Sequence, residues 1–381
     1  MNDILDPDRK MIHVLPCTDI SSGGLSPAVV HFNHALNRMG VRSEIVGCTG
    51  SLVGQGISYA GGTGNPNFGY SSNLSQFLTG KLRSNDIINI HGLWAYPNIV
   101  AGRLSRRLKF PLIIHPHGML EPWGMARGKF KKMLFRFLFE EKTFRQATCW
   151  RALTNREADQ IRQIVPDAKI IVVPNGVEIG TQDQAERLTA LDELWPELCG
   201  KKIMLYLSRL HPKKGLNLLA GAWKKLAPLF PDWHLVVAGG GDDGFVSHLK
   251  HELFYSCRNI CFVGTVEGQK KVKLFQRSDA FVLPSYSEGF SMAVLEAMSF
   301  GLPVVITSHC NFPEVQTVGA GFVVSAEETP LQVAMSHLME STDYKAMGLR
   351  GQRFVIDNYS WDVIARKFLK EFESTTRIAS Q

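Results

Sequence analysis

The sequence predicts an α/β protein made of two Rossmann-like domains, each a doubly wound parallel sheet, facing a cleft. Three observations predict this class. The chain has 381 residues, more than one hydrophobic core usually holds. Its composition, 45% hydrophobic and 20% charged, is that of an ordered globular protein. Short apolar runs alternate with amphipathic stretches twice along the chain, which is typical of strands alternating with helices.

The first set of elements occupies residues 1–180, which we assign to the first domain. Helical patterns with a period near 3.6 separate short apolar runs, so the connections are crossovers between parallel strands. The glycine-rich stretch 47–69 is expected to be a mobile loop. The predicted strands are 11–16, 42–47, 87–90, 112–115, 150–153 and 169–173, and the predicted helices are 27–39, 99–108, 129–144 and 156–163.

A second set follows the polar stretch that ends near residue 200, and we assign residues 181–358 to the second domain. The same alternation predicts another parallel sheet. A last amphipathic helix is predicted at 361–372. The predicted strands are 203–208, 235–238, 260–263, 280–283 and 304–306.

Composition also narrows the cellular context. The first ten residues lack the basic start and apolar run of a signal peptide, and no apolar stretch approaches the ~20 residues of a transmembrane helix. Seven scattered cysteines are expected to be reduced thiols, with Cys257 and Cys261 as packing residues. We therefore expect a cytoplasmic protein.

The net charge of +7 comes from the first half of the chain. Between Arg103 and Arg145, 11 basic residues occur with only three glutamates, and such a region attracts an anionic surface.

The stretch 284–305 carries the most informative motif. A predicted strand ends in a loop with Glu288 and Gly289, and a helix then runs to Gly301, a good residue after a helix end. The free N–H groups of such a helix start favour a phosphate, and Gly289 permits its close approach. Glu288 is placed to hold sugar hydroxyls and Glu296 a ribose diol. An acidic helix cap with one solvated glutamate is the alternative. The residues at the helix start are Phe290, Ser291 and Met292.

Residues 207–215 form a second candidate site, because Arg209 and Lys214 follow a strand and precede a helix. Two fixed cations at a strand end can neutralise a diphosphate leaving group. A solvated basic turn is the alternative. Gly23 and Gly24 form a weaker phosphate-binding signal in the first strand-to-helix turn.

Three histidines follow predicted strands of the first domain. His91 follows one strand, and His115 and His117 follow the next. Such a set invites a metal-binding interpretation. For His91 and His115 we favour packing beside the sheet. A neutral imidazole at His117 is suited to orienting a hydroxyl group.

These motifs together resemble those of the retaining GT-B glycosyltransferases of the glycogen-synthase-like and bacterial polysaccharide group, glycosyltransferase family 4. The similarity rests on E-x7-E from Glu288 to Glu296, on S-R-L-x-x-x-K-G around Arg209 and Lys214, and on G-G-L before the first helix, and it extends over residues 11–372. It implies a GT-B fold and a retaining transfer of sugar from a nucleoside-diphosphate donor. No metal ion or other cofactor is implied.

The resemblance also implies a role for individual residues. Arg209 and Lys214 bind the donor pyrophosphate, and His117 contacts the donor sugar near the reacting carbon. Glu288 and Glu296 keep the roles given above. Pro27 departs from the usual polar helix start after the glycine pair. Residues 359–381 are expected to pack back on the first domain. The remaining donor-binding residues are Gly23, Gly24, Gly239, Val263, Gly289, Phe290, Ser291 and Met292.

Acceptor and membrane contacts are expected in the first domain. The run 127–145 mixes cations with large apolar side chains, which suits an anionic membrane surface. An amphipathic helix whose apolar face packs into the core is the alternative. Relatives that glycosylate lipid-linked acceptors at the inner membrane face imply a glycan or lipid-linked acceptor. No nucleic-acid-binding motif occurs. The candidate acceptor residues are Trp94, Tyr96, Met119, Trp123 and Arg127.

Three other classes of function fit these motifs less well. A sugar-nucleotide epimerase or a phosphorylase shares the two-domain plan, but the E-x7-E motif with Arg209 and Lys214 argues against both. A non-catalytic sugar-nucleotide-binding scaffold subunit would be favoured if the key charges were missing, and they are present. An NAD enzyme ranks last, because the glycine turns lack the full dinucleotide fingerprint.

Overall fold

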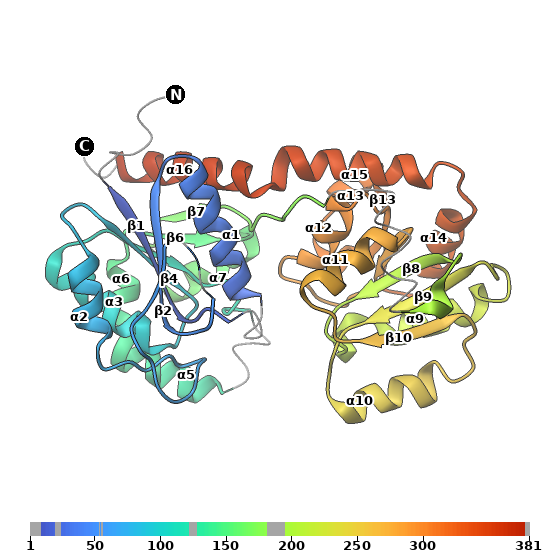
Figure 1. Ribbon diagram of the computed structural model, residues 1–381, viewed down its shortest axis with the longest axis horizontal. Coiled ribbons are helices and arrows are strands. Elements are labelled where there is room, and N and C mark those ends of the chain that lie inside the picture. The colour runs from blue at the N-terminus through green and yellow to red at the C-terminus, as the bar shows by residue number, and fades with distance from the viewer. Residues whose placement is uncertain are drawn as a thin grey trace. The chain divides into compact units, whose positions relative to one another are not determined.

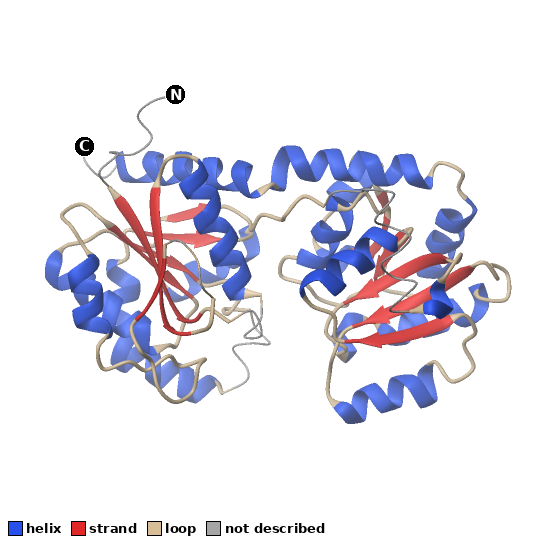
Figure 2. Cartoon of the chain, viewed as in Figure 1, coloured by secondary structure: helices blue, strands red, loops and turns tan. Residues whose placement is uncertain are grey.

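A computed structural model describes residues 9–19, 24–52, 54, 56–121, 128–180 and 195–377. The chain forms two compact units, Met1–Gly176 with Trp361–Gln381, and Val177–Ser360. Each unit is a parallel sheet with helices on both faces (Figures 1 and 2). The GT-B expectation of two such domains is confirmed in the fold of each unit.

The sheet of the first unit has seven parallel strands in the order β3-β2-β1-β4-β5-β6-β7. Its strands are β1 (Lys10–Cys17), β2 (Arg42–Thr49), β3 (Ile57–Tyr59), β4 (Ile87–His91), β5 (Leu112–His115), β6 (Cys149–Ala152) and β7 (Ile170–Val172). Its helices are α1 (Leu25–Arg38), α2 (Leu74–Lys81), α3 (Tyr96–Leu108), α5 (Lys129–Phe135), the π-helical η2 (Arg136–Glu140), α6 (Glu141–Gln146), α7 (Asn155–Ile164) and α16 (Trp361–Arg377).

Two short elements of this unit differ from the sequence-based expectation. Part of the expected loop 47–69 forms the edge strand β3, whose Ile57 pairs with Ile45 of β2. Sequence patterns also do not predict α2, which buries only Leu74 and Leu78. Three strand residues, or one helix with two buried side chains, give too weak a periodic signal to be recognised.

One buried face of the first sheet is polar. Along β1, Ile12 and Val14 belong to the hydrophobic core on one side of the sheet. His13 points to the other side and meets the edge of the Phe32 ring on α1. Phe368 of α16 packs edge-on against Phe32, with ring centroids 5.1 Å apart. Further buried polar residues of these strands include Ser43, Asn89, His91, His115 and Arg151.

The sheet of the second unit has six parallel strands in the order β10-β9-β8-β11-β12-β13. Its strands are β8 (Lys202–Leu207), β9 (Trp233–Ala238), β10 (Ile260–Gly264), β11 (Ala280–Leu283), β12 (Val304–Thr307) and β13 (Gly321–Val324), and only β13 is absent from the strands predicted above. Its longer helices are α9 (Leu216–Leu226), α10 (Asp243–His248), α11 (Gly268–Arg277), α12 (Met292–Ser299), α14 (Glu328–Glu340) and α15 (Tyr344–Tyr359). Its shorter helices are η3 (Pro196–Leu198), η4 (Pro212–Lys214), η5 (Leu249–Leu253), η6 (Ser308–Cys310) and α13 (Glu314–Thr317).

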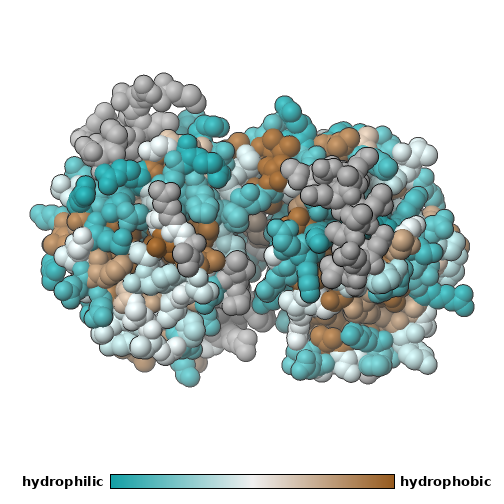
Figure 3. Space-filling model, in the orientation of Figure 1, coloured by the Kyte–Doolittle hydropathy of each residue, from teal (hydrophilic) through white to brown (hydrophobic). Residues whose placement is uncertain are grey.

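The face of each unit drawn in Figure 3 is largely hydrophilic, and the cysteines are unpaired. Hydrophilic side chains cover much of each unit on the face drawn in Figure 3, and hydrophobic ones gather in smaller areas. Among the helices described, none combines the length and apolarity needed to cross a bilayer. All seven cysteines are free. Burial raises the pKa of the Cys48 and Cys149 thiols to about 12, so both are neutral packing groups.

Candidate functional site

Gly215 helps to position Lys214 at the carboxyl end of the second sheet. Lys214 ends the short helix η4, and Gly215 follows in the left-handed region with φ +71°. A Cβ on Gly215 would collide with the carbonyl oxygen of Pro284, directly after β11. Only glycine permits both this conformation and this close approach. The loop after β8 is therefore held against the loop after β11, which carries Glu288.

Lys214 and Glu288 form a buried ion pair. Their Nζ and Oε1 atoms are 2.5 Å apart, and the residues are 9% and 7% exposed. The Ser285 hydroxyl donates to the same Oε1 at 2.6 Å. Asn311 donates to the Glu288 carbonyl at 2.7 Å, so the backbone of this residue is also fixed. Because removing one charge would leave the other buried and uncompensated, the two side chains depend on each other.

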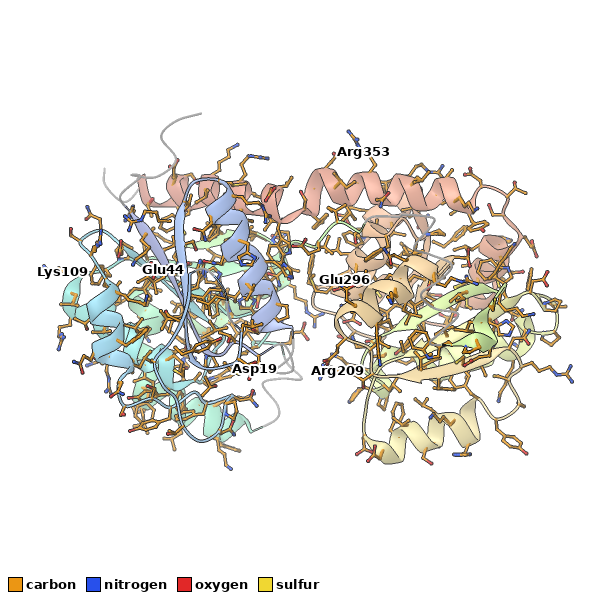
Figure 4. The ribbon with its side chains drawn as sticks, in the orientation of Figure 1. Asp19, Glu44, Lys109, Arg209, Glu296 and Arg353 are labelled. Carbon is orange, nitrogen blue, oxygen red and sulfur yellow. The ribbon has the colours of Figure 1, made fainter. Side chains whose placement is uncertain are left out.

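Arg209 supplies an unpaired cation in the same segment as Lys214. It is exposed at the strand edge (Figure 4) and forms no ion pair within the part of the chain that the structure describes. Burial lowers the pKa of the neighbouring His211, and Lys213, Arg209 and Lys214 lower it further. The loop thus presents a positive field suited to an anion.

Glu296 lies on α12, whose N-terminus follows Gly289. The helix begins at Met292 after Ser291, slightly later than expected, and Gly301 follows its end with φ +70°. Glu296 accepts a hydrogen bond from the Lys271 ammonium of α11 at 2.6 Å, and both side chains are partly exposed. Glu288 and Glu296 are therefore separate acidic positions, each paired with its own lysine.

Histidines of the first unit form a hydrogen-bonded chain that ends at His117. His13 Nδ1 lies 2.8 Å from His91 Nε2, and His91 Nδ1 lies 2.9 Å from His117 Nε2. His13 and His91 are buried, and His117 is partly exposed. Burial, and then the Arg151 cation, lower the pKa of His117 to about 3. The His117 ring is therefore neutral at pH 7.

Glu157 holds the His117 backbone in an uncommon conformation. His117 has φ +54°, in the left-handed region that non-glycine residues rarely adopt. The next N–H, of Gly118, donates to Glu157 Oε1 at 2.6 Å, and Leu153 N–H donates to Oε2 at 2.7 Å. Glu157 itself is buried at the start of α7. Its carboxylate thereby fixes the loop that carries His117.

The arrangement of the histidines disfavours a metal centre. Nitrogen atoms of His91, His115 and His117 lie within 4.8 Å of one another, as a three-ligand site requires. However, the His91 and His115 rings stack at 26°, and those of His115 and His117 at 19°. A bound metal lies close to the plane of each ligating ring, which nearly parallel stacked rings do not permit. Both His91 nitrogens also already have histidine partners.

Among the described candidate acceptor residues, Trp94 and Met119 lie in loops and Tyr96 begins a helix. Trp94 has φ +57°, and its N–H donates to Glu140 Oε1 at 3.0 Å. Tyr96 begins α3, and its ring lies 4.8 Å from that of Tyr70. Met119 accepts the Leu93 N–H through its sulfur at 3.2 Å. The predicted residues Gly23, Trp123 and Arg127 lie outside the described residues.

Matches to known proteins cover both units. Residues 23–176 match a family described as glycosyl transferase 4-like domain, and residues 196–347 match glycosyl transferases group 1. The chain belongs to the group 1, family 4-like glycosyltransferases. The motifs around Glu288 and Arg209 fall inside the group 1 match. Neither the epimerase nor the scaffold alternative is favoured by these matches.

Relatives of this glycosyltransferase include enzymes of glycolipid synthesis. It is 25% identical over 215 residues to phosphatidyl-myo-inositol mannosyltransferase of Mycobacterium leprae (strain TN), covering 55% of each chain. It is 28% identical over 268 residues to the lipopolysaccharide core biosynthesis mannosyltransferase LpsB of Rhizobium meliloti (strain 1021), covering 65% of this chain and 74% of that one. The chain spans about half the length of the first curated relatives it matches.

A solved structure shows the same fold. The HepE protein of Anabaena in complex with UDP and glucose has a TM-score of 0.71 at 16% identity, covering 96% of this chain and 100% of that one. The glycosyltransferase described here therefore has the GT-B fold predicted from its sequence.

Its segment α5–η2–α6 exposes large apolar side chains. Phe130 is 85% exposed and Phe137 is 76% exposed. The interpretation that this apolar face packs into the core is wrong, because these side chains contact solvent. Arg136 and Arg145 both bind Glu141, at 2.8 Å and 2.7 Å, which fixes the helical segment on its polar side. The other exposed apolar residues are Met133, Leu134, Leu138 and Phe139.

Several residues at or near the candidate site do not emerge from the sequence patterns. His13 interrupts the apolar run of β1, and that single polar residue is the only signal for it. Arg151 lies in β6 among apolar neighbours in the same way. Glu140 and Glu157 look like ordinary charged helix residues until the fold buries them. Burial raises the pKa of the Glu140 carboxyl to about 7, although Asn98 and the Trp94 N–H oppose the shift.

Proposed function

We propose that this protein is a retaining, metal-independent hexosyltransferase that moves a sugar from a nucleoside-diphosphate donor to a glycan or lipid-linked acceptor. The reaction belongs to bacterial surface polysaccharide or glycolipid synthesis. The observation that carries the proposal is the buried pair of Lys214 and Glu288, with the exposed Arg209 in the same segment as Lys214. The pair supplies a cation and a carboxylate at one sheet edge, and Arg209 supplies a second cation.

The charges of the site support a diphosphate ligand. The Lys214 ammonium is paired with the Glu288 carboxylate. A diphosphate brings its own negative charge, so Lys214 and Arg209 bind it and Glu288 becomes available to sugar hydroxyls. The first N–H groups of α12, after Gly289, add further donors for the phosphate. Two fixed cations stabilise the leaving group without a metal ion.

The remaining donor contacts follow from the same arrangement. Glu296 binds the ribose diol, and the Lys271 ammonium at 2.6 Å fixes its carboxylate. Gly239 and Val263 shape the pocket for the base. His117 of the first unit orients the donor sugar as a neutral imidazole. Gly23 and Gly24 bind the diphosphate from the first strand-to-helix turn.

The transfer step retains configuration by attack on the same face as departure. The acceptor oxygen forms a bond to the anomeric carbon while the bond from that carbon to the phosphate oxygen breaks. The acceptor proton passes to the leaving phosphate. No covalent protein intermediate is formed. The charge that develops on the phosphate is stabilised by Arg209 and Lys214.

The acceptor side is proposed from the relatives and from the exposed segment. Two relatives are named as mannosyltransferases acting on phosphatidyl-myo-inositol or in the lipopolysaccharide core. Exposed Phe130 and Phe137, with Lys131 and Lys132 in the same segment, suit an anionic lipid surface. We therefore place the enzyme in the cytoplasm, peripheral on the inner membrane face. Trp94, Tyr96, Met119, Trp123 and Arg127 are the proposed acceptor contacts.

Nucleotide-induced thermal stabilisation tests the donor site. UDP, GDP, ADP and their sugar conjugates are screened, and one nucleotide is expected to raise the Tm of the wild type, by about 2.7 kcal/mol of added stability at a hundredfold excess over Kd. Arg209→Ala and Lys214→Ala should reduce that rise. Lys213→Ala, the neighbouring residue, is the matched control and should keep it. The rise should persist with excess EDTA.

Two results of this screen would contradict the proposal. Each variant is compared with its own ligand-free Tm, since Lys214→Ala leaves Glu288 buried and unpaired. Arg209 is exposed, so its replacement does not threaten the fold. Equal stabilisation of Arg209→Ala, Lys214→Ala and wild type would remove both residues from the donor site. A rise that EDTA abolishes would overturn the metal-free scheme.

A further inference from the structure

A chain of hydrogen-bonded histidines connects the core of the first sheet to His117, and both of its links use the same pair of ring atoms. Each link joins the Nδ1 atom of one ring to the Nε2 atom of the next, first from His13 to His91 and then from His91 to His117. At its inner end, His13 Nε2 lies 3.1 Å from the Ser43 hydroxyl. His115 binds Asn89 Oδ1 instead, at 3.0 Å, and lies outside this chain.

Each contact between two ring nitrogens must hold one proton. Two N–H groups facing each other at 2.8–2.9 Å would clash, and two bare nitrogens would repel through their lone pairs. A neutral imidazole carries a single N–H. The rings are neutral, because burial lowers the pKa of His13 and His117 to about 3 and that of His91 well below its usual value.

These conditions leave two arrangements. If His13 carries its proton on Nδ1, it donates to His91 Nε2, so the His91 proton lies on Nδ1 and is donated to His117 Nε2. His117 then carries its own proton on Nδ1. If His117 instead donates from Nε2, every ring is protonated on Nε2, and His13 donates to the Ser43 oxygen. If the rings carried their protons on different nitrogens, at least one of the two contacts between rings would hold two protons or none.

We propose that His13, His91 and His117 always carry their protons on the same ring nitrogen, which makes His13 and His91 positioning residues for His117. Ser43 ends the chain, and its hydroxyl can satisfy either arrangement, because it can donate to or accept from His13 Nε2. His117 Nδ1 is then a donor in one state and an acceptor in the other, with no change in net charge. This role rests on the proposed function of His117 toward the donor sugar.

Nitrogen-15 labelling of the histidine rings tests the proposal on the ligand-free full chain. Long-range proton–nitrogen spectra report which ring nitrogen bears hydrogen, and the variants His13→Gln, His91→Gln and His117→Gln assign the signals. The same nitrogen is expected to be protonated in all three rings, in the wild type and in Ser43→Ala. Protonation on different nitrogens in any two rings would overturn the proposal.

A kinetic comparison tests the positioning role. Where Ser43→Ala changes the shared tautomer, kcat for transfer should change about tenfold while the donor KM stays within about twofold, since His117 acts on the reacting sugar. Ser58→Ala is the matched control, because its hydroxyl donates to the Ile45 carbonyl at 3.2 Å outside the chain. A change of tautomer in Ser43→Ala without a change in kcat would refute the positioning role. A change in kcat without a change of tautomer would refute it as well. The spectra need no substrate, so they decide the tautomers even if no donor is found.

Discussion

At the scale of single residues, the fold places carboxyls in environments that change their chemistry. Glu140 is fully buried, and its Oε1 accepts hydrogen bonds from Trp94 N–H at 3.0 Å and Asn98 at 3.3 Å. Its Oε2 has no hydrogen-bond partner among the described residues. Burial is the dominant effect, and it raises the pKa to about 7. Glu288 is buried too, and it forms an ion pair with the Lys214 ammonium at 2.5 Å.

Glu140 should make stability depend on pH. Its folded-state pKa is raised from 4.5 to about 7, so the folded protein keeps a proton that the unfolded chain releases. The associated stability is full below pH 4.5 and is lost as pH rises through about 7, up to about 3 kcal/mol. Glu140→Gln, which mimics the protonated form, should therefore gain stability relative to wild type between pH 5 and pH 8.

Urea unfolding at both pH values measures this difference. The exposed Glu267→Gln is the control and should show no such gain. Parallel behaviour of Glu140→Gln and wild type at the two pH values would mean that Glu140 ionises normally in the folded protein.

At the scale of elements, the segment α5–η2–α6 combines two surfaces. Its apolar side chains are exposed, with Phe130 and Phe137 the most exposed. Its polar contacts fix it to the unit, because Arg136 also donates to the Ile164 carbonyl at 3.0 Å. Lys132 lies over the Trp94 ring, 4.4 Å from its centroid. A fixed helix with exposed apolar and basic side chains is what an interfacial membrane contact requires.

Binding to anionic vesicles should depend on this segment. Neutralising Lys129, Lys131 and Lys132 should weaken co-sedimentation with phosphatidylserine-containing vesicles by about 3 kcal/mol, near a hundredfold in affinity, at about 1 kcal/mol for each basic residue. Lys367→Gln with Lys370→Gln, on exposed positions of α16 in the same unit, is the control. Unchanged sedimentation of the triple variant would exclude the segment as a membrane contact.

At the scale of the whole molecule, the chain returns to its first unit after completing the second. Residues 361–381 belong to the unit formed by residues 1–176. Helix α16 packs on α1 there, with Phe368 5.1 Å from Phe32 between ring centroids, and Arg38 binds Asp362 at 2.6 Å. Each unit has its own sheet and its own hydrophobic core. The buried apolar residues of α16 are Trp361, Ile364, Ala365, Phe368, Leu369 and Phe372.

Ending the chain after Ser360 should unfold the first unit alone. The large apolar side chains of α16 contribute about 1.5–3 kcal/mol each on burial, which together rivals the stability of a typical domain. Differential scanning calorimetry should show a transition lost in the truncated chain and the transition of the second unit retained. Ending the chain after Arg377 is the control. Two intact transitions after truncation at Ser360 would show that α16 is dispensable for the first unit.

Much of the fold and part of the site could be predicted from sequence. The strands of both sheets carry apolar runs, and the motif from Glu288 to Glu296 identifies its strand, loop and helix by local pattern. The missed elements β3, α2 and β13 bury few side chains and leave little periodic signal. The helices α14 and α15 are also absent from the sequence-based expectation, although α14 buries five side chains. Local pattern likewise gives no sign that Lys271 pairs with Glu296, because the two residues are 25 positions apart and both look solvated.

The sequence by itself determined the family, the parallel α/β plan of each unit and the candidate donor residues, because these depend on periodicity and on motifs contiguous in the chain. Only the tertiary structure decided which charges meet and which are buried. Lys214 meets Glu288 across 74 positions, and His13 meets His91 across 78. Such contacts depend on the order of strands in the sheet, β2-β1-β4-β5 in the first unit. A polar side chain acquires its pKa and its partners only when that order is in place, since neighbouring strands supply both the burial and the partners.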